Sequence, residues 1–239
     1  IMKTRLFALS LSLCFTATAA ADDRGKLIFE DNFERNESQE EKEELSNGWG
    51  SNSKSRAKGN KQVDLKDGAM FIETHAEADH PASVTHEAEF VDGTVELRFM
   101  LEDEKDTLGL DFADLKFKEV HAGHLFKVDV GTKFVQINDM KTGSMNMKFQ
   151  DAKKAGTLTD EQKAFLKTTT TRFPLKVDAN KWHSMVVTIT GDTVAVTIGD
   201  KEAGRFTSAG FAHPTKRMLR LAVPRSAVVD DIRIFAKAH

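Results

Sequence analysis

Short segments in which apolar and polar residues alternate recur along the sequence from residue 26 to residue 236. A β-strand turns successive side chains to opposite faces, so this period of two predicts strands that each bury one face. Gly, Asp and Asn separate the segments, and Gly191-Asp192 is a typical hairpin turn. The predicted strands cover residues 26–33, 68–74, 83–90, 93–101, 124–130, 133–139, 183–190, 193–200, 217–224 and 228–236.

The predicted strands do not alternate with helices, and this pattern favours antiparallel sheets in an all-β sandwich. Two stretches break the pattern. Residues 34–45 are strongly charged and form either a short exposed helix or a loop. Residues 156–168 place Thr159 and Gln162 at the spacing of a capping box, which predicts one short helix inserted between strands.

The N-terminal residues have the pattern of a secretory signal peptide. Lys3 and Arg5 precede an apolar run over residues 6–15, and small residues follow in "TATAA". We therefore expect residues 1–21 to be removed, residues 22–239 to form a single domain, and the protein to be secreted or periplasmic. The apolar run is too short to cross a bilayer, and no later segment has eighteen consecutive apolar residues, so no membrane span is expected in the mature chain.

Composition excludes several kinds of chemistry. Cys14 is the only cysteine and lies in the predicted signal peptide, so the mature chain has neither a disulfide nor a thiolate metal site. The formal net charge is -3, and no basic face points to a nucleic acid partner. The chain has no tyrosine and two tryptophans, Trp49 and Trp182, which limits the aromatic rings on which a sugar could stack.

His121 and His124 are the most conspicuous candidates for chemistry. On a regular strand, residues three apart face opposite ways, so the two rings would not share a ligand. Gly123 between them would permit a bulge that restores a common direction. Zinc or manganese would need a third ligand, for which Asp111, Glu119 and Asp139 are within reach in the sequence. The alternative is that both histidines bond only to the backbone or to neighbouring carboxylates.

A hairpin of residues 124–130 and 133–139 would add further groups. If its turn is Gly131-Thr132, Asp139 lies near His121 or Glu119, with Lys141 close by. Such a patch could bind hydroxyls or do acid–base work, and it could equally be a surface cluster of salt bridges.

Three pieces of the sequence resemble jelly-roll proteins of the laminin-G-like and concanavalin A-like type. They are "LIFEDNFERNE…SNGWG", "DANKWHSMVVTITGDTVAVTIGDKEAGRF" and "VVDDIRIF", the last of which would pair beside the first strand. With "DLKDGAMFIET", "GTVELRFML" and "AGFAHPTKRMLRLAVPRSAVVDDIRIF", the arrangement most resembles the 3-keto-disaccharide hydrolase domain family over nearly the whole mature chain. The resemblance implies a two-sheet, jelly-roll β-sandwich.

The sequence departs from the resembling family at one segment, and the resemblance also implies a metal site. "TLGLDFADLKFKEVHAGHLFKV" stands where familiar hydrolase members carry a segment like N-S-G-I-F-F-R. The E-x-D-x-x-E pattern of laminarinase-type glycosidases, which places two carboxylates beside one glycosidic bond, is absent from the sequence. Several of the resembling folds hold a structural calcium near the first and last strands, where Asp31, Asp230 and Asp231 would be the ligands; the alternative is ordinary turn and strand-end aspartates.

The expected function is that of a secreted glycan-directed protein, which binds and hydrolyses a saccharide on the concave sheet face. The alternative is a non-catalytic carbohydrate-binding or cell-envelope interaction module. Either a structural calcium or a catalytic transition metal is a candidate cofactor. The catalytic candidates are His121, His124, Glu119, Asp139 and Lys141, and the candidates for contacting the saccharide are Trp49, Lys127 and His213. Trp182 is expected in the core.

Overall fold

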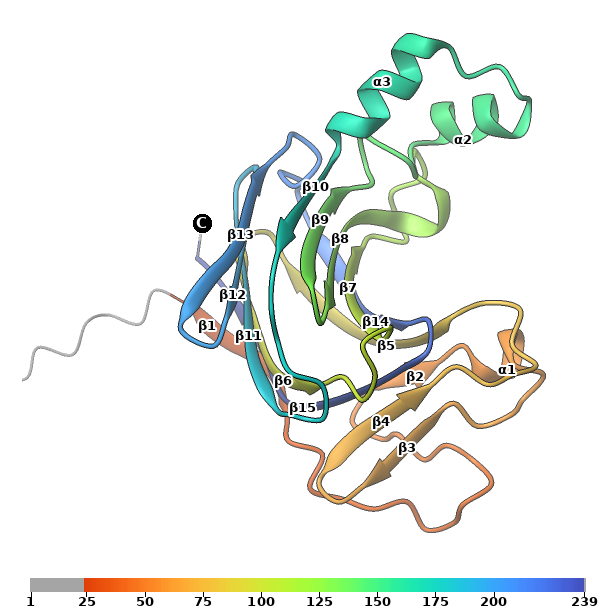
Figure 1. The fold of residues 1–239 in the computed structure, drawn as a ribbon, viewed down its shortest axis with the longest axis vertical. Coiled ribbons are helices and arrows are strands. Elements are labelled where there is room, and N and C mark those ends of the chain that lie inside the picture. Colours follow the sequence, from red (N-terminus) through yellow and green to blue (C-terminus); the bar gives the residue numbers. More distant parts are fainter. Residues whose placement is uncertain (1–23, 239) are drawn as a thin grey trace, which may run out of the picture.

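The computed structural model describes residues 24–238, and they form a sandwich of two antiparallel sheets (Figure 1). The predicted signal peptide, residues 1–21, lies outside the described residues. No helix within residues 24–238 is long and apolar enough to cross a membrane. The all-β sandwich predicted from the alternation is therefore confirmed, and each predicted strand coincides with an observed one.

One sheet has eight strands and the other has seven. The eight-stranded sheet runs in the order β13-β12-β11-β6-β15-β4-β3, and β1 also pairs with β15. Its strands are β1 Lys26–Asp31, β3 Val63–Lys66, β4 Ala69–Glu73, β6 Gly93–Met100, β11 His183–Thr190, β12 Thr193–Ile198, β13 Lys201–Thr207 and β15 Ser226–Ala236.

The seven-stranded sheet runs in the order β10-β9-β8-β7-β14-β5-β2. Figure 1 shows that it curves, and we call the face that it turns away from the eight-stranded sheet the concave face. Its strands are β2 Gly50–Ser51, β5 Ala82–Phe90, β7 Thr107–Ala113, β8 His124–Gly131, β9 Phe134–Asp139, β10 Thr170–Pro174 and β14 Lys216–Val223.

Apolar side chains fill the space between the sheets. Phe99 of β6 and Phe112 of β7 are among the largest fully buried side chains. Phe112 stacks on Phe126 of β8 with ring centroids 4.5 Å apart, and Phe126 in turn contacts Phe211 at 5.2 Å. Each such side chain contributes about 1.5–3 kcal/mol when it leaves water, so the alternating residues that meet here account for the sandwich.

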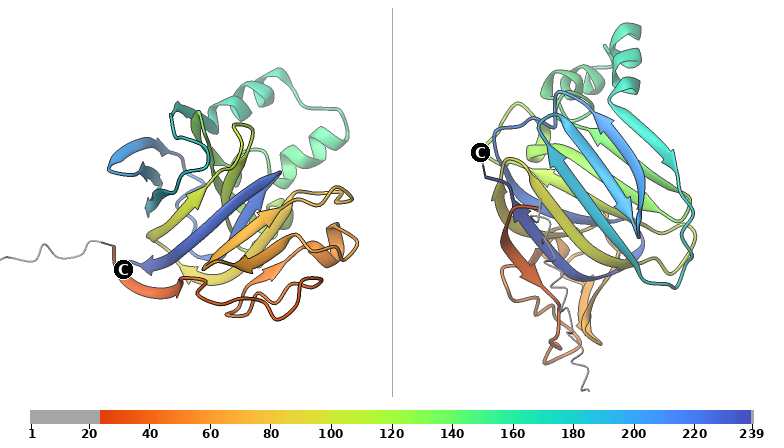
Figure 2. Two further views of the ribbon diagram at one scale, coloured as in Figure 1. Left: turned by 60° about the horizontal axis from the view of Figure 1, so that its bottom comes forward. Right: turned by 90° about the vertical axis from the view of Figure 1, so that its left-hand side faces the viewer.

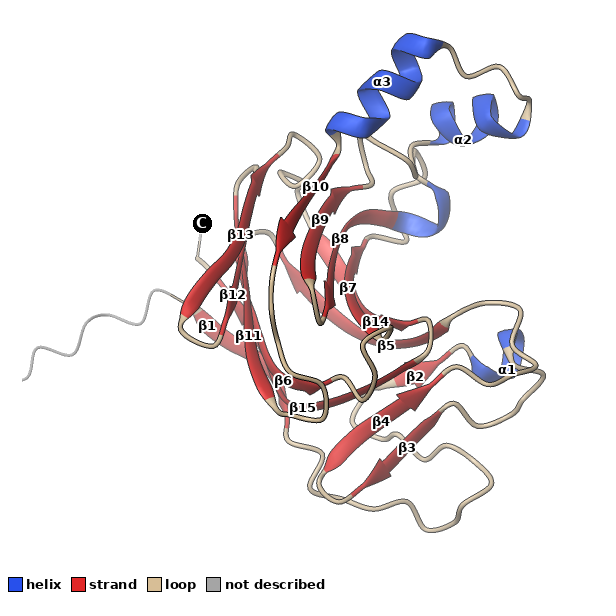
Figure 3. Cartoon of the chain, in the orientation of Figure 1, coloured by secondary structure: helices blue, strands red, loops and turns tan. Residues whose placement is uncertain are grey.

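The helical elements lie outside the sheets, as Figure 3 shows. They are α1 Ser53–Arg56, the 3-10 turn η1 His121–Gly123, α2 Met147–Lys154 and α3 Asp160–Thr168. The predicted inserted helix is α3, and its Thr159–Gln162 capping box is present. α2 was not predicted. Both views in Figure 2 show α2 and α3 projecting together from one end of the sandwich.

The two ends of the described chain meet in one sheet. β1 pairs antiparallel with β15, with Lys26 opposite Ala236 and Asp31 opposite Ile232. This confirms the expectation that the last strand lies beside the first. Residues 34–45, left open between a helix and a loop, contain neither helix nor strand.

Candidate functional site

A row of polar side chains crosses six neighbouring strands on the concave face. The registers place Thr85 opposite Arg220, Arg220 opposite Asp111 and Asp111 opposite Lys127. Lys127 in turn lies opposite Asn138, and Asn138 opposite Thr170. We call these six residues, from β5, β14, β7, β8, β9 and β10, the polar row: Thr85, Arg220, Asp111, Lys127, Asn138 and Thr170.

The apolar neighbours of these residues fix their direction. Leu110 and Phe112 flank Asp111 and are fully buried, and Leu219 and Leu221 flank Arg220 in the same way. Because strand side chains alternate, burying these neighbours between the sheets turns the polar residues to the concave face. The core packing therefore positions the polar row.

Asp111 and His124 form the closest pair in this region. Oδ2 of Asp111 lies 2.5 Å from Nδ1 of His124. An ionised carboxylate can only accept, so Nδ1 carries the proton and donates it to Asp111. The side chain of His124 is 22% exposed while that of Asp111 is 5% exposed, so the imidazole, and not the carboxylate, is open to a ligand. Nε2 is then the ring nitrogen left to exchange a proton.

Arg220 completes this group from β14. Its Nη2 donates to the carbonyl oxygen of Ala122 at 2.7 Å, and its Nη1 lies 3.9 Å from Oδ1 of Asp111. Nη1 is also 3.0 Å from Nδ1 and 3.5 Å from Nε2 of His124. A guanidinium can only donate, so with the proton on Nδ1 the ring atom that accepts from Nη1 is Nε2, and the approach to Nδ1 is a contact between two donors beside the charge of Asp111.

Lys127 and Asp129 lie next along β8, where a glycine on β7 makes room for them. Nζ of Lys127 is 2.7 Å from Oδ1 of Asp129. A Cβ added to Gly109, which lies opposite Asp129, would be 2.2 Å from Cε of Lys127 and 2.8 Å from Oδ1 of Asp129. Gly109 therefore lets this ion pair lie flat across the concave face.

The polar row ends at β9 and β10. Oγ1 of Thr170 donates to Oδ1 of Asn138 at 2.9 Å. In the neighbouring register row, Gln136 lies opposite Arg172, and the guanidinium carbon of Arg172 lies 3.5 Å from the ring centroid of Phe134. Donors, acceptors and one partly exposed aromatic ring thus lie together at this end.

A turn that only glycine can make brings His121 to the same region. Ala122 and Gly123 both have positive φ, 50° and 74°. A Cβ on Gly123 would lie 2.6 Å from the carbonyl oxygen of Asp114. After this turn the rings of His121 and His124 are nearly parallel, with centroids 6.5 Å apart. Gly123 thus lies in η1, and the β7–β8 ladder has a register shift next to it, where Ala113 pairs with His124.

The other catalytic candidates lie elsewhere. The hairpin has its turn at Thr132 and Lys133, one residue later than expected. This shifts the pairing by two residues, so Asp139 lies opposite Phe126 and not beside His121. Asp139 is fully buried and accepts hydrogen bonds from Thr142, Ser208 and the backbone N–H of Gly210. The placement near His121 or Glu119 was therefore wrong.

Glu119 and Lys141 also have structural surroundings. Glu119 is exposed, and its carbonyl oxygen accepts from the backbone N–H of Met147. Nζ of Lys141 lies 5.6 Å from the ring centroid of Phe117. Neither side chain joins the Asp111–His124 pair. Within residues 24–238, no group of three or more His, Cys, Asp or Glu side chains converges as a metal site, so the donor set does not fit a histidine-bound metal.

The three predicted calcium ligands, Asp31, Asp230 and Asp231, each bind other protein groups. Asp31 is 6% exposed and accepts from Arg35 at 2.7 and 2.9 Å, from Asn47, from the indole N–H of Trp49 and from the backbone N–H of Phe33. Burial raises the pKa of Asp31, but these hydrogen bonds outweigh it and leave the pKa lowered. Its lone pairs are therefore already occupied.

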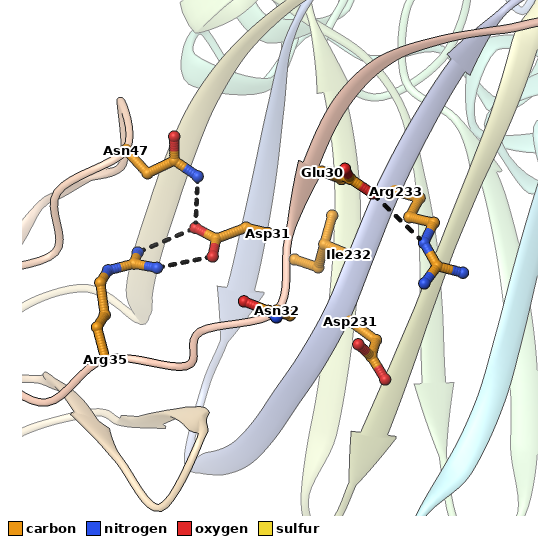
Figure 4. Close-up of a pocket in the computed structure, with 8 residues that line it drawn as sticks. All are labelled: Glu30, Asp31, Asn32, Arg35, Asn47, Asp231, Ile232 and Arg233. Atoms are coloured by element: carbon orange, nitrogen blue, oxygen red, sulfur yellow. Dashed lines mark hydrogen bonds and ion pairs between the residues drawn. The ribbon is translucent and has the colours of Figure 1, made fainter.

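Asp230 and Asp231 bind the guanidinium of Arg98 instead, at 3.2 and 3.5 Å. Burial raises the pKa of Asp230. A cavity of about 400 Å³ separates Asp31 from Asp231, and Figure 4 shows the Asp31 carboxylate turned toward Arg35 and Asn47, with Asp231 across the cavity. The three aspartates do not gather around one point.

Two of the residues predicted to contact a saccharide, Trp49 and His213, are buried. Trp49 is 7% exposed and packs on Phe33, so it offers no free ring face, whereas Trp182 is 37% exposed and lies under Arg98. The burial of the two indoles is therefore the reverse of what was expected, and Trp49 is a core residue. His213 is 4% exposed, its Nε2 lies 3.2 Å from Oδ2 of Asp114, and burial lowers its pKa. It is a core residue and does not line a rim.

Arg220 is the main residue that sequence reasoning missed. It lies between two buried leucines in "RMLRLAVP", and this alternation is the signal that could have placed it on the concave face. Its meeting with Asp111 depends on strands more than a hundred residues apart in the chain, which no local pattern specifies.

No protein-family model and no curated protein sequence matches the chain. Solved structures do resemble it. The laminarinase from Rhodothermus marinus matches with a TM-score of 0.60 and 14% identity over 90% of this chain and 98% of its own. The laminarinase from Flavobacterium sp. UMI-01 matches with a TM-score of 0.56 and 14% identity, over 88% of this chain and 100% of its own.

A binding module has the same architecture. The carbohydrate-binding module CBM66 from Bacillus subtilis matches with a TM-score of 0.51 and 12% identity, over 77% of this chain and 93% of its own. At these identities the likeness establishes the fold, a jelly-roll β-sandwich of the concanavalin A-like type.

Proposed function

We propose that the protein binds a saccharide chain along the polar row of the concave face. The observation that carries this proposal is the continuity of the row, in which six neighbouring strands each contribute a donor or acceptor. Strands lie about 4.8 Å apart, close to the length of one sugar unit, so the row could follow roughly 24 Å of a glycan. Sugar hydroxyls both donate and accept, and they match such a surface.

The structural neighbours support the same class of ligand. Two are laminarinases and one is a carbohydrate-binding module, by their names. Another protein of similar structure, with a TM-score of 0.59 and 14% identity, is an endo-beta-1,3(4)-glucanase that holds a 1,3-beta-D-cellobiosyl-glucose at its active site. These proteins share their fold with this chain. The polar row and the names of these proteins together support the binding of a glycan as its function.

We propose further that Asp111 and His124 act as an acid–base pair on the bound saccharide, as in cleavage of a 3-keto-glycoside. Asp111 orients the imidazole through Nδ1, so Nε2 can take or give a proton. Arg220 beside them would stabilise negative charge that develops on a ligand oxygen. This assignment moves the catalytic role from Asp139 and Glu119 to Asp111.

A binding module without catalysis is the second candidate, and β7 supplies the observation that favours it. The residues that β7 turns to the concave face are Thr107, Gly109, Asp111 and Ala113, so this strand offers one carboxylate there. A glycosidase with two carboxylates needs a second one beside the same bond. If the chain does not cleave sugars, the polar row remains its binding surface.

Isothermal titration calorimetry with a panel of hexasaccharides tests binding. Asn138→Ala and Lys127→Met should each lower the affinity for the best ligand about tenfold. This is the cost of losing one hydrogen bond to a charged group, or two hydrogen bonds between neutral groups. Lys133→Met is the matched control because Lys133 also forms an ion pair, with Glu104, but at an exposed turn. Equal affinity of all three variants and wild type would refute a site on the polar row.

Turnover of a 3-keto-glucoside separates the two candidates. His124→Ala should abolish turnover if the acid–base assignment is right. His183 lies on the other sheet and its ring bonds to the carbonyl oxygen of Asp178, so His183→Ala should leave turnover unchanged. Binding without turnover in the wild type would leave the binding module as the function.

We also propose that residues 1–21 direct export. N-terminal sequencing of the mature protein from a periplasmic or culture fraction should begin at Asp22. A cytoplasmic protein that retains residues 1–21 would contradict this proposal.

A further inference from the structure

The insertion between β9 and β10 carries an unusual concentration of positive charge. We call residues 141–168, which include α2 and α3, the basic arm. It contains three carboxylates, Asp151, Asp160 and Glu161, whereas the chain as a whole has a net charge of -3. Its six lysines are Lys141, Lys148, Lys153, Lys154, Lys163 and Lys167.

These charges face solvent and do little for the fold. Neither α2 nor α3 contains a buried residue. Within the described part of the chain, Lys163 is the one arm lysine in an ion pair, with Asp160 at 2.9 Å. Lys148, Lys153, Lys154 and Lys167 are exposed, so a cluster of unneutralised cations stands on the arm.

The basic arm joins two members of the polar row in the chain, because it starts three residues after Asn138 and ends two residues before Thr170. α3 ends at Thr168, and Thr170 is the last member of the row. At the other end of the arm, the backbone N–H of His121 donates to the carbonyl oxygen of Met145 at 2.8 Å. Figure 1 shows α2 and α3 standing at the end of the concave sheet formed by β8, β9 and β10.

Buried hydrogen bonds hold the root of the basic arm in place. Asp139, at the end of β9, accepts from the backbone N–H and the hydroxyl of Thr142 at 3.0 and 2.6 Å, and from Ser208 and Gly210. A Cβ on Gly210 would lie 1.9 Å from Oδ1 of Asp139, so only glycine permits this arrangement. The arm is therefore fixed relative to the sheet at its base.

The basic arm also presents aromatic surface, and the adjacent sheet adds a cation. Phe149 and Phe165 stack with centroids 5.7 Å apart, and Phe165 is 44% exposed. Arg172 on β10 lies over Phe134, and no ion pair neutralises it within residues 24–238. Rings beside cations suit a sugar chain that carries anionic groups.

We propose that the ligand is an anionic polysaccharide, whose carboxylate or sulfate groups contact the basic arm where the chain leaves the polar row. This inference rests on the proposed function and names its substrate class. The charge complementarity is local, because the arm is positive on a protein that is negative overall. Exposed cations act through screened Coulomb attraction, so this part of the affinity depends on salt.

The test compares two probes on three proteins. The probes are an oligogalacturonate hexamer, which is anionic, and a laminarihexaose, which is neutral. The arm variant combines Lys148→Gln, Lys153→Gln, Lys154→Gln and Lys167→Gln. The control variant combines Lys26→Gln, Lys54→Gln, Lys181→Gln and Lys201→Gln, four exposed lysines elsewhere, and has the same net charge.

The wild type should bind the oligogalacturonate more tightly than the laminarihexaose, and 0.5 M salt should remove the difference, since it shortens the screening length to about 4 Å. The arm variant should lose about tenfold for the anionic probe, as expected from four exposed charge contacts, while the control variant stays within about twofold.

Three results would overturn the inference. In the first, the wild type prefers the neutral probe. In the second, the arm variant binds the anionic probe as well as the control variant does. In the third, a single-stranded DNA or an anionic lipid vesicle binds as tightly as the oligogalacturonate. If Asn138→Ala still weakens the neutral probe, the proposed function survives that failure; if neither probe binds the wild type, both fail.

Discussion

Nδ1 of His124 donates to Oδ2 of Asp111 at 2.5 Å, although the two residues lie on different strands, β8 and β7. The carboxylate is almost fully buried and the imidazole is not. A buried carboxylate that accepts from a partly exposed imidazole makes the pair a candidate for proton transfer. The same hydrogen bond fixes Nδ1 as the ring nitrogen that carries the proton.

Removing the acceptor should change the tautomer of His124. In Asp111→Ala, Nδ1 loses its partner and the ring should shift toward the Nε2–H form. Long-range ¹H–¹⁵N NMR spectra of the histidine rings report this directly. Asp129→Asn is the control, because Asp129 lies on the same face but pairs with Lys127. Unchanged ring-nitrogen shifts of His124 in Asp111→Ala would contradict the pairing.

Gly109→Val should impair binding without unfolding the protein. A side chain there would displace the flexible end of Lys127 and part of Asp129. Saccharide affinity should fall about tenfold, the loss of one charged hydrogen bond, while Tm changes little. Ala195→Val on the outer face of β12 is the matched control. A variant that binds like wild type would show that the Lys127–Asp129 pair does not contact the ligand.

Gly123→Ala should destabilise the fold more than Gly156→Ala. Both glycines have similar positive φ, 74° and 69°, and an alanine there costs about 1–2 kcal/mol. At Gly123 the new Cβ also meets the backbone of Asp114, whereas nothing lies within 4 Å at Gly156. Urea denaturation should give an additional loss of about 1–3 kcal/mol at Gly123. Equal losses would mean that the η1 turn is not as tight as described.

The stability of the protein should rise between pH 8 and pH 10 because of Lys216. Its side chain is fully buried, and burial lowers its pKa from 10.5 to about 8. Below pH 8 the ammonium is charged in both states, so the cost of burying it is fully present. Above pH 8 the folded state loses the proton while the unfolded state keeps it until about pH 10.4, so unfolding becomes less favourable, by roughly 3 kcal/mol at most.

Urea denaturation at pH 7.5 and pH 10 measures this rise. Lys216→Met should remove it, since methionine has no proton to lose, and Lys201→Met at an exposed position should keep it. The same rise in both variants would assign the effect to other groups.

The fold was largely accessible from the sequence because the alternation of apolar and polar residues is a local signal. It identified the hairpin of β8 and β9, and the Thr159–Gln162 spacing identified α3. The helix α2 escaped because it is polar and has no buried face to produce a pattern. Local signals therefore specified the elements but not all of their packing.

The site was only partly accessible, for two physical reasons. A turn at Thr132-Lys133 in place of Gly131-Thr132 shifts every pair in the hairpin by two residues, and this shift moved Asp139 away from the histidines. Arg220 reaches Asp111 only through the β7–β14 ladder, which closes a loop of more than a hundred residues. The local alternation of apolar and polar residues specifies neither the register of a hairpin nor the pairing of strands far apart in the sequence.

The central claim is that the saccharide lies on the polar row, and NMR mapping of a bound oligosaccharide tests it most directly. On titration with the best hexasaccharide ligand, the amide and side-chain signals of Lys127, Asn138 and Thr170 should shift, while those of Thr188 and Thr197 on the other sheet should not. Shifts confined to the eight-stranded sheet, or to residues around the Asp31 cavity, would contradict the account.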